Sequence, residues 1–230
     1  TLPNHASVVR TGTALPGTDN ATYDNGADIN GVPYAKGLSV VNLSYDPATI
    51  TEGYDVLMAV KKTSNNTAVT FTDNGDYTYT IAWMPSADIT VSVTEIPIIA
   101  YIDADGNPQS HACTPIVEGT TSYQTLGRTE GWYVVNSDVT FNNQTVKFLD
   151  QTVHVILCDG AHFSINSGVF SSLEVPNGSL EILAQSNGSG ELDLRSSGSS
   201  ALEVEMNKNR CIDINGGNII IYDGTYGIFA

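Results

Sequence analysis

Short apolar segments separated by Gly, Asn, Asp and Ser recur through residues 131–230. Within such a segment apolar and polar positions alternate, so that Leu202 and Val204 fall on one side of the chain and Glu203 on the other. A period of two places one face of a β-strand in a core and the other in water. Apolar residues do not recur at spacings of three and four over three turns, so the pattern predicts almost no helix.

These segments predict successive strands of a parallel β-solenoid. Units of the pattern begin near Val153, Ser171, Gly190 and Arg210, at steps of 18, 19 and 20 residues. We therefore expect roughly four coils with turns of variable length, and Trp132 over the start of their core. The clearest segments are 153–158, 179–183, 191–194, 201–206, 211–214 and 218–222.

Residues 38–94 contain shorter β-type segments spaced about ten residues apart, which is typical of a small antiparallel sandwich. Asp-Pro-Ala-Thr at 46–49 and Asp-Asn-Gly-Asp at 73–76 separate them, and the second of these predicts a hairpin. In the last segment, 89–94, the three aliphatic residues share one face. The preceding residues, 1–36, are rich in turn formers and predict an extended lead-in with one strand around 6–11.

Two motifs in this part are typical of a known class of repeat. Residues 74–79 read Asn-Gly-Asp-Tyr-Thr-Tyr, and residues 83–91 read Trp-Met-Pro-Ser-Ala-Asp-Ile-Thr-Val. Together they resemble the closing hairpin and final strand of the immunoglobulin-like repeats of bacterial surface proteins. The resemblance covers roughly residues 38–95 and implies a stalk or spacer.

Ile96-Pro97 predicts a boundary after the sandwich. The next β-type segments, 98–102 and 109–116, flank residues 103–108, which read Asp-Ala-Asp-Gly-Asn-Pro. The Asp-x-Asp-x-Asn spacing is that of the start of a calcium loop, but Thr114 stands at the twelfth position, where such a loop needs Glu. Asp-Gly at 105–106 favours a hairpin turn instead. We therefore expect that the chain has no cofactor, with a bound calcium ion as the alternative.

The expected fold class is therefore all-β: a small immunoglobulin-like antiparallel β-sandwich followed by a short parallel β-helix. The expected divisions are 1–36 (lead-in), 37–96 (sandwich), 97–130 (hairpin and connector) and 131–230 (parallel β-helix).

Several ordered pieces from Tyr101 onward resemble a bacterial β-helix family described as carbohydrate-binding. They are Tyr-Ile-Asp-Ala-Asp-Gly-Asn at 101–107, Gly-Trp-Tyr-Val-Val at 131–135, Val-His-Val-Ile-Leu-Cys-Asp-Gly at 153–160, Leu-Ala-Gln-Ser-Asn-Gly-Ser-Gly at 183–190 and Ile-Asp-Ile-Asn-Gly-Gly at 212–217. The resemblance implies a right-handed parallel β-helix on a secreted or surface-displayed bacterial protein. Relatives of that fold include pectate lyases and non-catalytic polysaccharide binders.

Charge narrows the partners of the chain. Its 230 residues carry nine Lys and Arg against 25 Asp and Glu, which gives a net charge of −16. Nucleic acids and anionic membranes are bound by basic surfaces, so we do not expect either as a partner. The surplus carboxylates serve solubility, with calcium binding as the alternative. No apolar run approaches the length of a membrane span, so we expect no membrane insertion. Because the chain begins at Thr1 without Met, we expect it to be a mature or trimmed piece of a longer protein.

The chemistry-bearing residues do not form a recognisable catalytic motif. Cys113, Cys158 and Cys211 are scattered and predict small buried residues, although two of them pair if neighbouring coils bring them together. His5, His111, His154 and His162 lack zinc spacing, and His154 is expected to be a partly buried histidine with a satisfied partner rather than a metal or Cys-His site.

A hydrolase needs facing carboxylates and a lyase needs a base, and the sequence predicts neither arrangement. We therefore expect no enzymatic activity, with a polysaccharide lyase or hydrolase as the least favoured alternative. The candidate carboxylates are Glu181, Glu191, Asp193, Glu203, Glu205 and Asp213. The candidate bases are Arg195, Lys208 and Arg210.

Glycan binding needs aromatic faces and polar groups on an exposed surface. The sequence identifies no single binding residue, because each aromatic candidate also fits a core position. The candidates are Trp132, Tyr133, Phe163, Phe170, Tyr222, Tyr226 and Phe229.

The apolar pattern continues through 219–222 and 226–229, which predicts a final coil without a polar cap. We therefore expect the chain to continue or to pair end to end. The leading hypothesis is a bacterial extracellular or outer-surface module that binds a polysaccharide or a host or microbial glycan, as in adhesion. A self-associating stalk or fibre segment without a ligand is the alternative.

Overall fold

The computed structural model describes residues 40–125, 129–204, 211–223 and 226–229, and the backbone of β1 (Ala6–Val9), β2 (Asp28–Ile29) and β3 (Val32–Pro33). The described chain is all-β, with a single 3-10 turn at Pro47–Thr49. Its contacts define two compact units, the first ending at Glu95 and the second comprising Ile96–Thr125 and Thr129–Ala230. Most of the expected lead-in, 1–36, lies outside the described residues, as do His5, Glu205, Met206, Lys208 and Arg210.

The first unit is built from antiparallel strands. One sheet has the order β1-β4-β7-β6, and β5 lies next to β8 in a second sheet. The strands are β4 (Val41–Tyr45), β5 (Tyr54–Lys62), β6 (Thr72–Asp73), β7 (Thr78–Ile81) and β8 (Ile89–Ile102). Both sheets contribute to one core, in which Leu43, Met58 and Ile81 are almost fully buried.

Two local predictions for this unit are confirmed. β6 and β7 pair antiparallel around Asp73–Asp76, where Gly75 has a φ of +83°, a value that glycine adopts without strain. In β8, Val91 is buried in the core of the unit, and Ile89 and Val93 pack against it from the same face.

β8 does not end at the expected boundary but continues through Ile96-Pro97 to Ile102. Beyond Pro97 it pairs antiparallel with β9 (Pro108–Ala112), so the predicted hairpin at residues 103–108 is confirmed. The Asp103 carboxylate closes the turn by accepting hydrogen bonds from the backbone N–H groups of Asp105 (3.1 Å) and Asn107 (2.7 Å). These bonds lower the pKa of the Asp103 carboxyl, because they stabilise its charged form.

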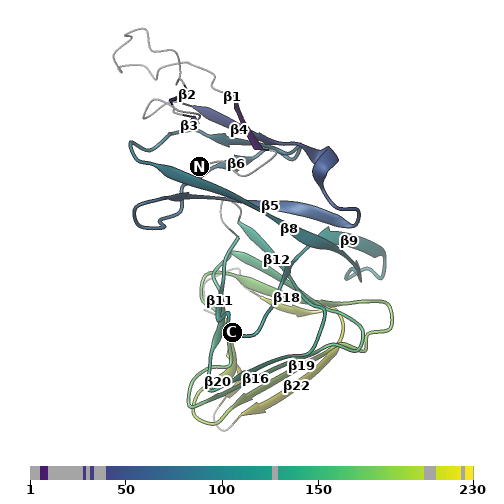
Figure 1. Cartoon of the computed structure of the whole chain (residues 1–230). Helices are drawn as coiled ribbons and strands as arrows, with labels where there is room; N and C mark the ends of the chain where they lie inside the picture. Colours follow the sequence, from purple (N-terminus) through teal and green to yellow (C-terminus); the bar gives the residue numbers. More distant parts are fainter. Residues whose placement is uncertain are drawn as a thin grey trace. The chain divides into compact units, whose positions relative to one another are not determined.

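The second unit is a parallel β-solenoid of about four turns, as predicted, and its coils have three faces (Figure 1). Face 1 contains β10 (Thr114–Pro115), β12 (Glu130–Val135), β15 (Thr152–Leu157), β18 (Ser179–Ala184) and β21 (Ile212–Ile214). Face 2 contains β13 (Val139–Asn142), β16 (His162–Gly168), β19 (Glu191–Ser196) and β22 (Asn218–Asp223). Face 3 contains β11 (Ser122–Tyr123), β14 (Val146–Phe148), β17 (Leu173–Val175), β20 (Ser200–Val204) and β23 (Tyr226–Phe229).

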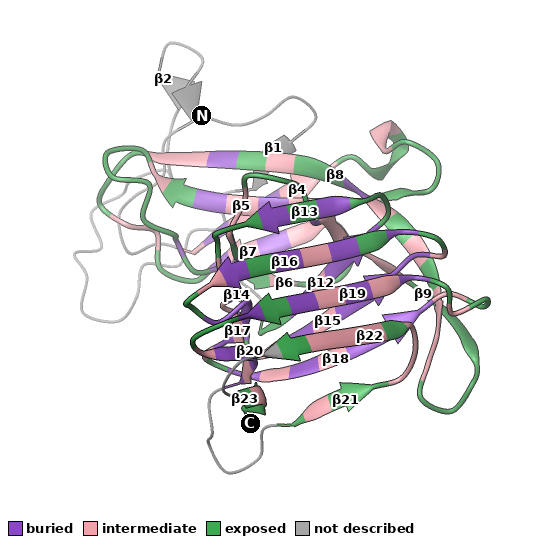
Figure 2. Ribbon diagram, turned by 90° about the horizontal axis from the view of Figure 1, so that it is seen from below, coloured by how far each residue is buried: buried purple, intermediate pink, exposed green. Residues whose placement is uncertain are grey.

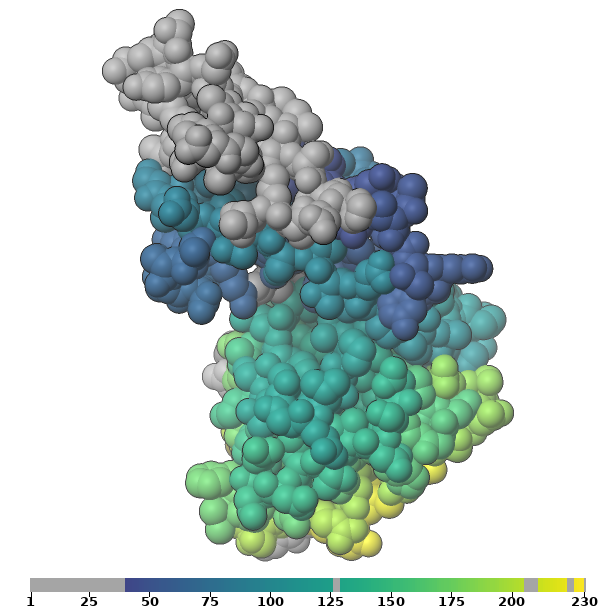
Figure 3. All heavy atoms as spheres, in the orientation of Figure 1, coloured from purple at the N-terminus to yellow at the C-terminus, as the bar shows by residue number. Residues whose placement is uncertain are grey.

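Beyond the first step, the coils are longer than the sequence predicted. One in-register column on face 1 runs through Thr114, Tyr133, Val155, Ile182 and Ile214, so the steps between coils are 19, 22, 27 and 32 residues. The expected units of 18–20 residues were wrong because successive units began on different faces and each covered only part of a coil. The space-filling view shows the surface of the solenoid passing from teal to yellow in chain order, as coils stack one after another (Figure 3).

Alternation along each strand fills the interior of the solenoid. Figure 2 shows buried positions alternating with half-buried or exposed ones along β13, β16 and β19. The inward side chains include Phe141, Phe148 and Phe163, all almost fully buried, together with Leu202 and Val204, whose inward direction was predicted. Strand pairing also begins before Gly131, since β10 and β11 of the segment expected as a connector already join faces 1 and 3.

The cysteines are all free, and two of them match the prediction. Cys113 and Cys158 are buried, and burial raises the pKa of the Cys113 thiol to about 12. Cys211 differs from the prediction because it is exposed on the last coil, where its thiol lies 3.2 Å from the Asp213 carboxylate.

Candidate functional site

The outward side of face 2 is a regular array of mostly polar side chains, which we call the open face. In the view of Figure 2 no other described element lies in front of β13, β16, β19 and β22. Its side chains form three in-register rows across the strands, and strands in a sheet lie about 4.8 Å apart. The rows are His162–Glu191–Asn218, Thr140–Ser164–Asp193–Ile220 and Asn142–Asn166–Arg195–Tyr222.

Arg195 contacts both Asp193 and Tyr222 on the open face. Nη2 of Arg195 lies 2.7 Å from Oδ2 of Asp193, and Nε lies 3.0 Å from both carboxylate oxygens. The pairing raises the pKa of the Arg195 guanidinium. Cζ of Arg195 lies 4.8 Å from the centroid of the Tyr222 ring, a cation–π distance, and 57% of Tyr222 is exposed. The guanidinium is therefore held between a carboxylate and an open aromatic ring.

The row beside it, His162–Glu191–Asn218, presents accessible polar side chains. Nδ1 of His162 lies 3.4 Å from Oε1 of Glu191, and both side chains are accessible. The backbone N–H of His162 donates to Asp138 (3.0 Å), which fixes the start of β16. The open face thus combines charged, amide and hydroxyl groups at strand spacing.

Face 1 differs because the β8–β9 hairpin contacts its outward side. The indole of Trp132 stacks between two imidazoles, with its centroid 4.0 Å from that of His111 on β9 and 3.9 Å from that of His154 on β15. Tyr101 of β8 lies against the same indole at 5.4 Å. Trp132 therefore packs on the core cluster from outside and joins the hairpin to the coil, rather than covering the start of the core.

His154 is a partly buried histidine with a polar partner, as predicted. Its Nδ1 lies 2.6 Å from Oε2 of Glu181, whose other oxygen accepts a hydrogen bond from Asn215 (2.8 Å). His162 lies on face 2, so the turn between the two histidines separates them onto different faces. Burial raises the pKa of the neighbouring Tyr101 hydroxyl, and the Glu181 charge adds to this effect.

The candidate carboxylates are distributed around the solenoid. Glu181 and Asp213 lie side by side on face 1, Glu191 and Asp193 lie on face 2, and Glu203 lies on face 3. Glu203 accepts a hydrogen bond from the Ser171 hydroxyl (2.6 Å). Among the described residues, no group of three or more His, Cys, Asp or Glu side chains is placed to hold a metal ion.

The aromatic candidates divide into buried and open positions. Tyr133 and Phe163 are in the core, whereas Phe170, Tyr222, Tyr226 and Phe229 are exposed. Phe170 lies at the corner between faces 2 and 3, where its carbonyl accepts hydrogen bonds from the Ser167 and Ser196 hydroxyls. Of the exposed aromatics, Tyr222 is the one in a row of the open face.

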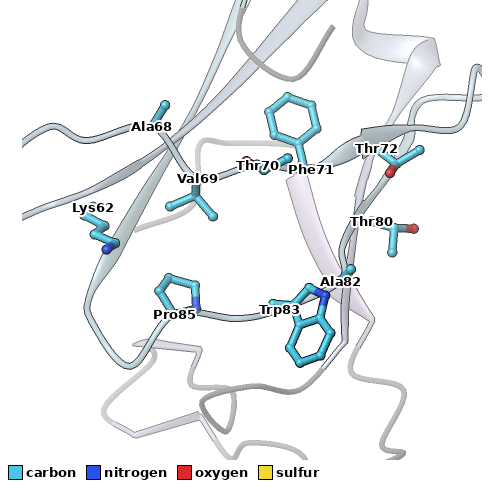
Figure 4. Close-up of a pocket in the computed structure, with 10 residues that line it drawn as sticks. All are labelled: Lys62, Ala68, Val69, Thr70, Phe71, Thr72, Thr80, Ala82, Trp83 and Pro85. Carbon is cyan, nitrogen blue, oxygen red and sulfur yellow. The ribbon is translucent and has the colours of Figure 1, made fainter. Parts of the chain in front are cut away.

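A second candidate site lies in the first unit and was missed in the sequence. It is a pocket of about 360 Å³ whose wall includes Lys62, Val69, Phe71, Trp83 and Pro85 (Figure 4). Trp83 is 63% exposed. The sequence contained an indication of this site. Trp83 is followed by Met-Pro, which interrupts the alternation of apolar and polar residues at a turn. A large apolar side chain at a turn has no position in the core and is therefore a candidate for contact with a ligand.

Comparisons of the chain with protein-family models, curated proteins and solved structures found no match. In the part of the chain that the structure describes, no helix is long and apolar enough to cross a membrane.

Proposed function

We propose that this chain is a non-catalytic glycan-binding module and that the open face binds a neutral polysaccharide. The observation that carries the proposal is the uncovered Asp193–Arg195–Tyr222 arrangement in register with rows of amide and hydroxyl groups. Sugar sites combine an aromatic face with polar groups that bind hydroxyls, and Tyr222 and its neighbours supply both. A neutral ligand fits because the chain carries a net charge of −16.

The roles of the side chains follow from their chemistry. The Tyr222 ring stacks against the apolar side of a pyranose, and Arg195 keeps that ring in place from the adjacent strand. Asn166 and Ser164 donate and accept hydrogen bonds, while the Asp193 carboxylate accepts them. Because the rows repeat from strand to strand, the ligand is an extended polymer that crosses several strands.

The wider setting is part of the same proposal. The motifs at 74–79 and 83–91 support an immunoglobulin-like spacer, and the pieces from Tyr101 onward support a right-handed β-helix of the carbohydrate-binding type. Together with the acidic, Ser-, Thr- and Asn-rich composition, they support display on the outside of a bacterial cell.

Binding to a panel of plant, host and microbial polysaccharides, measured by calorimetry, tests this function. Tyr222→Ala is expected to weaken binding about tenfold through loss of ring stacking. Lys147→Ala is the matched control, because Lys147 forms an ion pair with Glu174 on the outward side of face 3. Absence of binding to every polysaccharide, or equal effects of both variants, would contradict the proposal.

A second candidate function is end-to-end self-association, and the last coil favours it. Ile214 is 46% exposed and Ile228 47%, whereas Ile182 and Leu202, which precede them in the same columns, are fully buried. A second copy would cover these side chains and pair with the open strand edges. Sedimentation at micromolar concentration is expected to show dimers that Ile228→Lys abolishes and that Val169→Lys, on the exposed corner, leaves intact.

A further inference from the structure

The pocket of the first unit forms where two chain segments separate. One wall comes from Lys62, at the end of β5, and from residues 68–72. The other comes from Thr80 of β7 and from Ala82, Trp83 and Pro85, which follow β7. Val69 and Phe71 are nearly buried and anchor the first wall in the core. Figure 4 shows the side chains of Val69 and Pro85 pointing toward each other across the hollow, with Lys62 on one side and Trp83 on the other.

Trp83 is placed as a ligand-contacting side chain would be. The following residue, Met84, packs against the core of the unit, whereas Trp83 is 63% exposed at the pocket. The other tryptophan of the chain, Trp132, is half-buried between two imidazoles. An open indole beside a hollow presents the face on which pyranose rings stack.

The charge of the pocket wall is opposite to that of the whole chain. The wall contains Lys62 and no Asp or Glu, although the chain has 25 acidic residues against nine basic ones. Lys62 makes no ion pair within the described residues. Its backbone is fixed, because its N–H donates to the Thr67 carbonyl (2.8 Å) and its carbonyl accepts from Asn66 (2.9 Å). A fixed, half-buried lysine with a free ammonium group is matched by an anionic ligand.

Hydroxyl groups complete the lining. Thr70 and Thr72 are exposed at the rim, while the Thr80 hydroxyl already donates to Asn42 (2.9 Å). The side chains of Thr70 and Thr72 are therefore open to solvent along the first wall of the pocket. The wall therefore presents an open aromatic ring, an ammonium group and hydroxyls at separate points along the hollow, and an acidic oligosaccharide carries groups that match all three.

We propose that this pocket binds the acidic end of a glycan, in which a uronic or sialic acid is joined to at least one further sugar. The carboxylate of the acidic sugar pairs with Nζ of Lys62, a neighbouring sugar ring lies on the Trp83 indole, and hydroxyls of the glycan bond with Thr70 and Thr72. The site is separate from the open face in residues and in ligand charge. It does not depend on the function proposed above.

Titration of the full chain with 3′-sialyllactose and with a glucuronate-terminated disaccharide tests the site, with lactose as the neutral control. Trp83→Ala is expected to lower affinity for both acidic sugars about tenfold. Lys62→Gln is expected to remove the preference for acidic over neutral sugar and the dependence of binding on salt. Trp83→Phe keeps an aromatic face and is expected to retain most of the affinity while removing the fluorescence change of Trp83.

Tyr222→Ala separates the two sites. It is expected to leave binding of the acidic sugars unchanged, whereas Trp83→Ala leaves binding of neutral polysaccharide unchanged. The proposal is overturned if the native chain does not bind either acidic sugar, or binds them no better than lactose. It is also overturned if folded Trp83→Ala binds them as tightly as the native chain.

Discussion

The hydroxyl of Tyr133 donates a hydrogen bond to the carboxylate of Asp150 inside the solenoid. The other carboxylate oxygen accepts from the backbone N–H of Thr125 (2.9 Å), and Asp150 is only 3% exposed. Burial raises the pKa of the Asp150 carboxyl, and these hydrogen bonds only partly oppose the rise. Burial and the adjacent carboxylate also raise the pKa of Tyr133. A buried acid thus ties the first coils together.

The stability of the native protein should therefore depend on pH through Asp150. Because its folded-state pKa is above its unfolded-state value, the folded state binds the proton more tightly, and this stabilisation is complete below the unfolded-state pKa. It is lost as pH rises through the folded-state pKa. Asp150→Asn removes this contribution and keeps an oxygen acceptor. Urea unfolding should be measured from about pH 3.5, near the ordinary pKa of a carboxyl group, to about pH 7. The free energy of unfolding should decrease less with rising pH for the variant than for the native protein. The same dependence of the free energy on pH in both proteins would refute the assignment.

Gly131 is required beside this pair because a side chain has no space there. A methyl group at Gly131 would lie 2.3 Å from Oδ2 of Asp150 and 2.6 Å from Cε2 of Tyr133. Gly131→Ala is expected to lower the free energy of unfolding by about 1–3 kcal/mol, as overpacking of a core does. Gly227→Ala is the control, since its nearest neighbour would be 3.5 Å away. Equal unfolding midpoints for the two variants would show that the pair moves aside.

Trp132→Ala is expected to loosen the β8–β9 hairpin. The substitution removes the indole that stacks on His111 and Tyr101, so the hairpin loses its aromatic contact with face 1. Hydrogen exchange should become faster at residues 98–112, while β16 and β19 on face 2 stay protected. Trp83→Ala is the matched control, because Trp83 is exposed and lies on a different unit. Unchanged exchange in the hairpin would mean that its strand pairing alone holds it.

Thiol modification should distinguish the three cysteines. Cys211 is exposed and is expected to react first with an alkylating reagent, although the neighbouring Asp213 raises its pKa and slows the reaction. Cys113 and Cys158 are buried with raised pKa values and should react only after unfolding. Mass spectrometry of peptides before and after addition of urea measures the order. Early labelling of Cys113 would indicate that the β9 end of the hairpin opens.

Alternation of apolar and polar residues determined which segments form strands and which side of each is buried, as at Leu202, Val204 and Val91. The turn residues at 103–108 likewise determined the hairpin between β8 and β9, because the residue preferences of a turn are local. Alternation did not determine the coil length, because three strands with similar patterns make up one coil. Only the register showed that Tyr133, Val155 and Ile182 form one column.

The candidate sites depended on tertiary structure even more strongly. Arg195 and Tyr222 are 27 residues apart in sequence and meet only because β19 and β22 pair in register. Trp132 had the same apolar character as Tyr133, but its position on the outward side placed it between His111 and His154. Sequence therefore determined which side chains alternate, whereas coil stacking decided their neighbours, because contacts across a solenoid join residues that are distant in the chain.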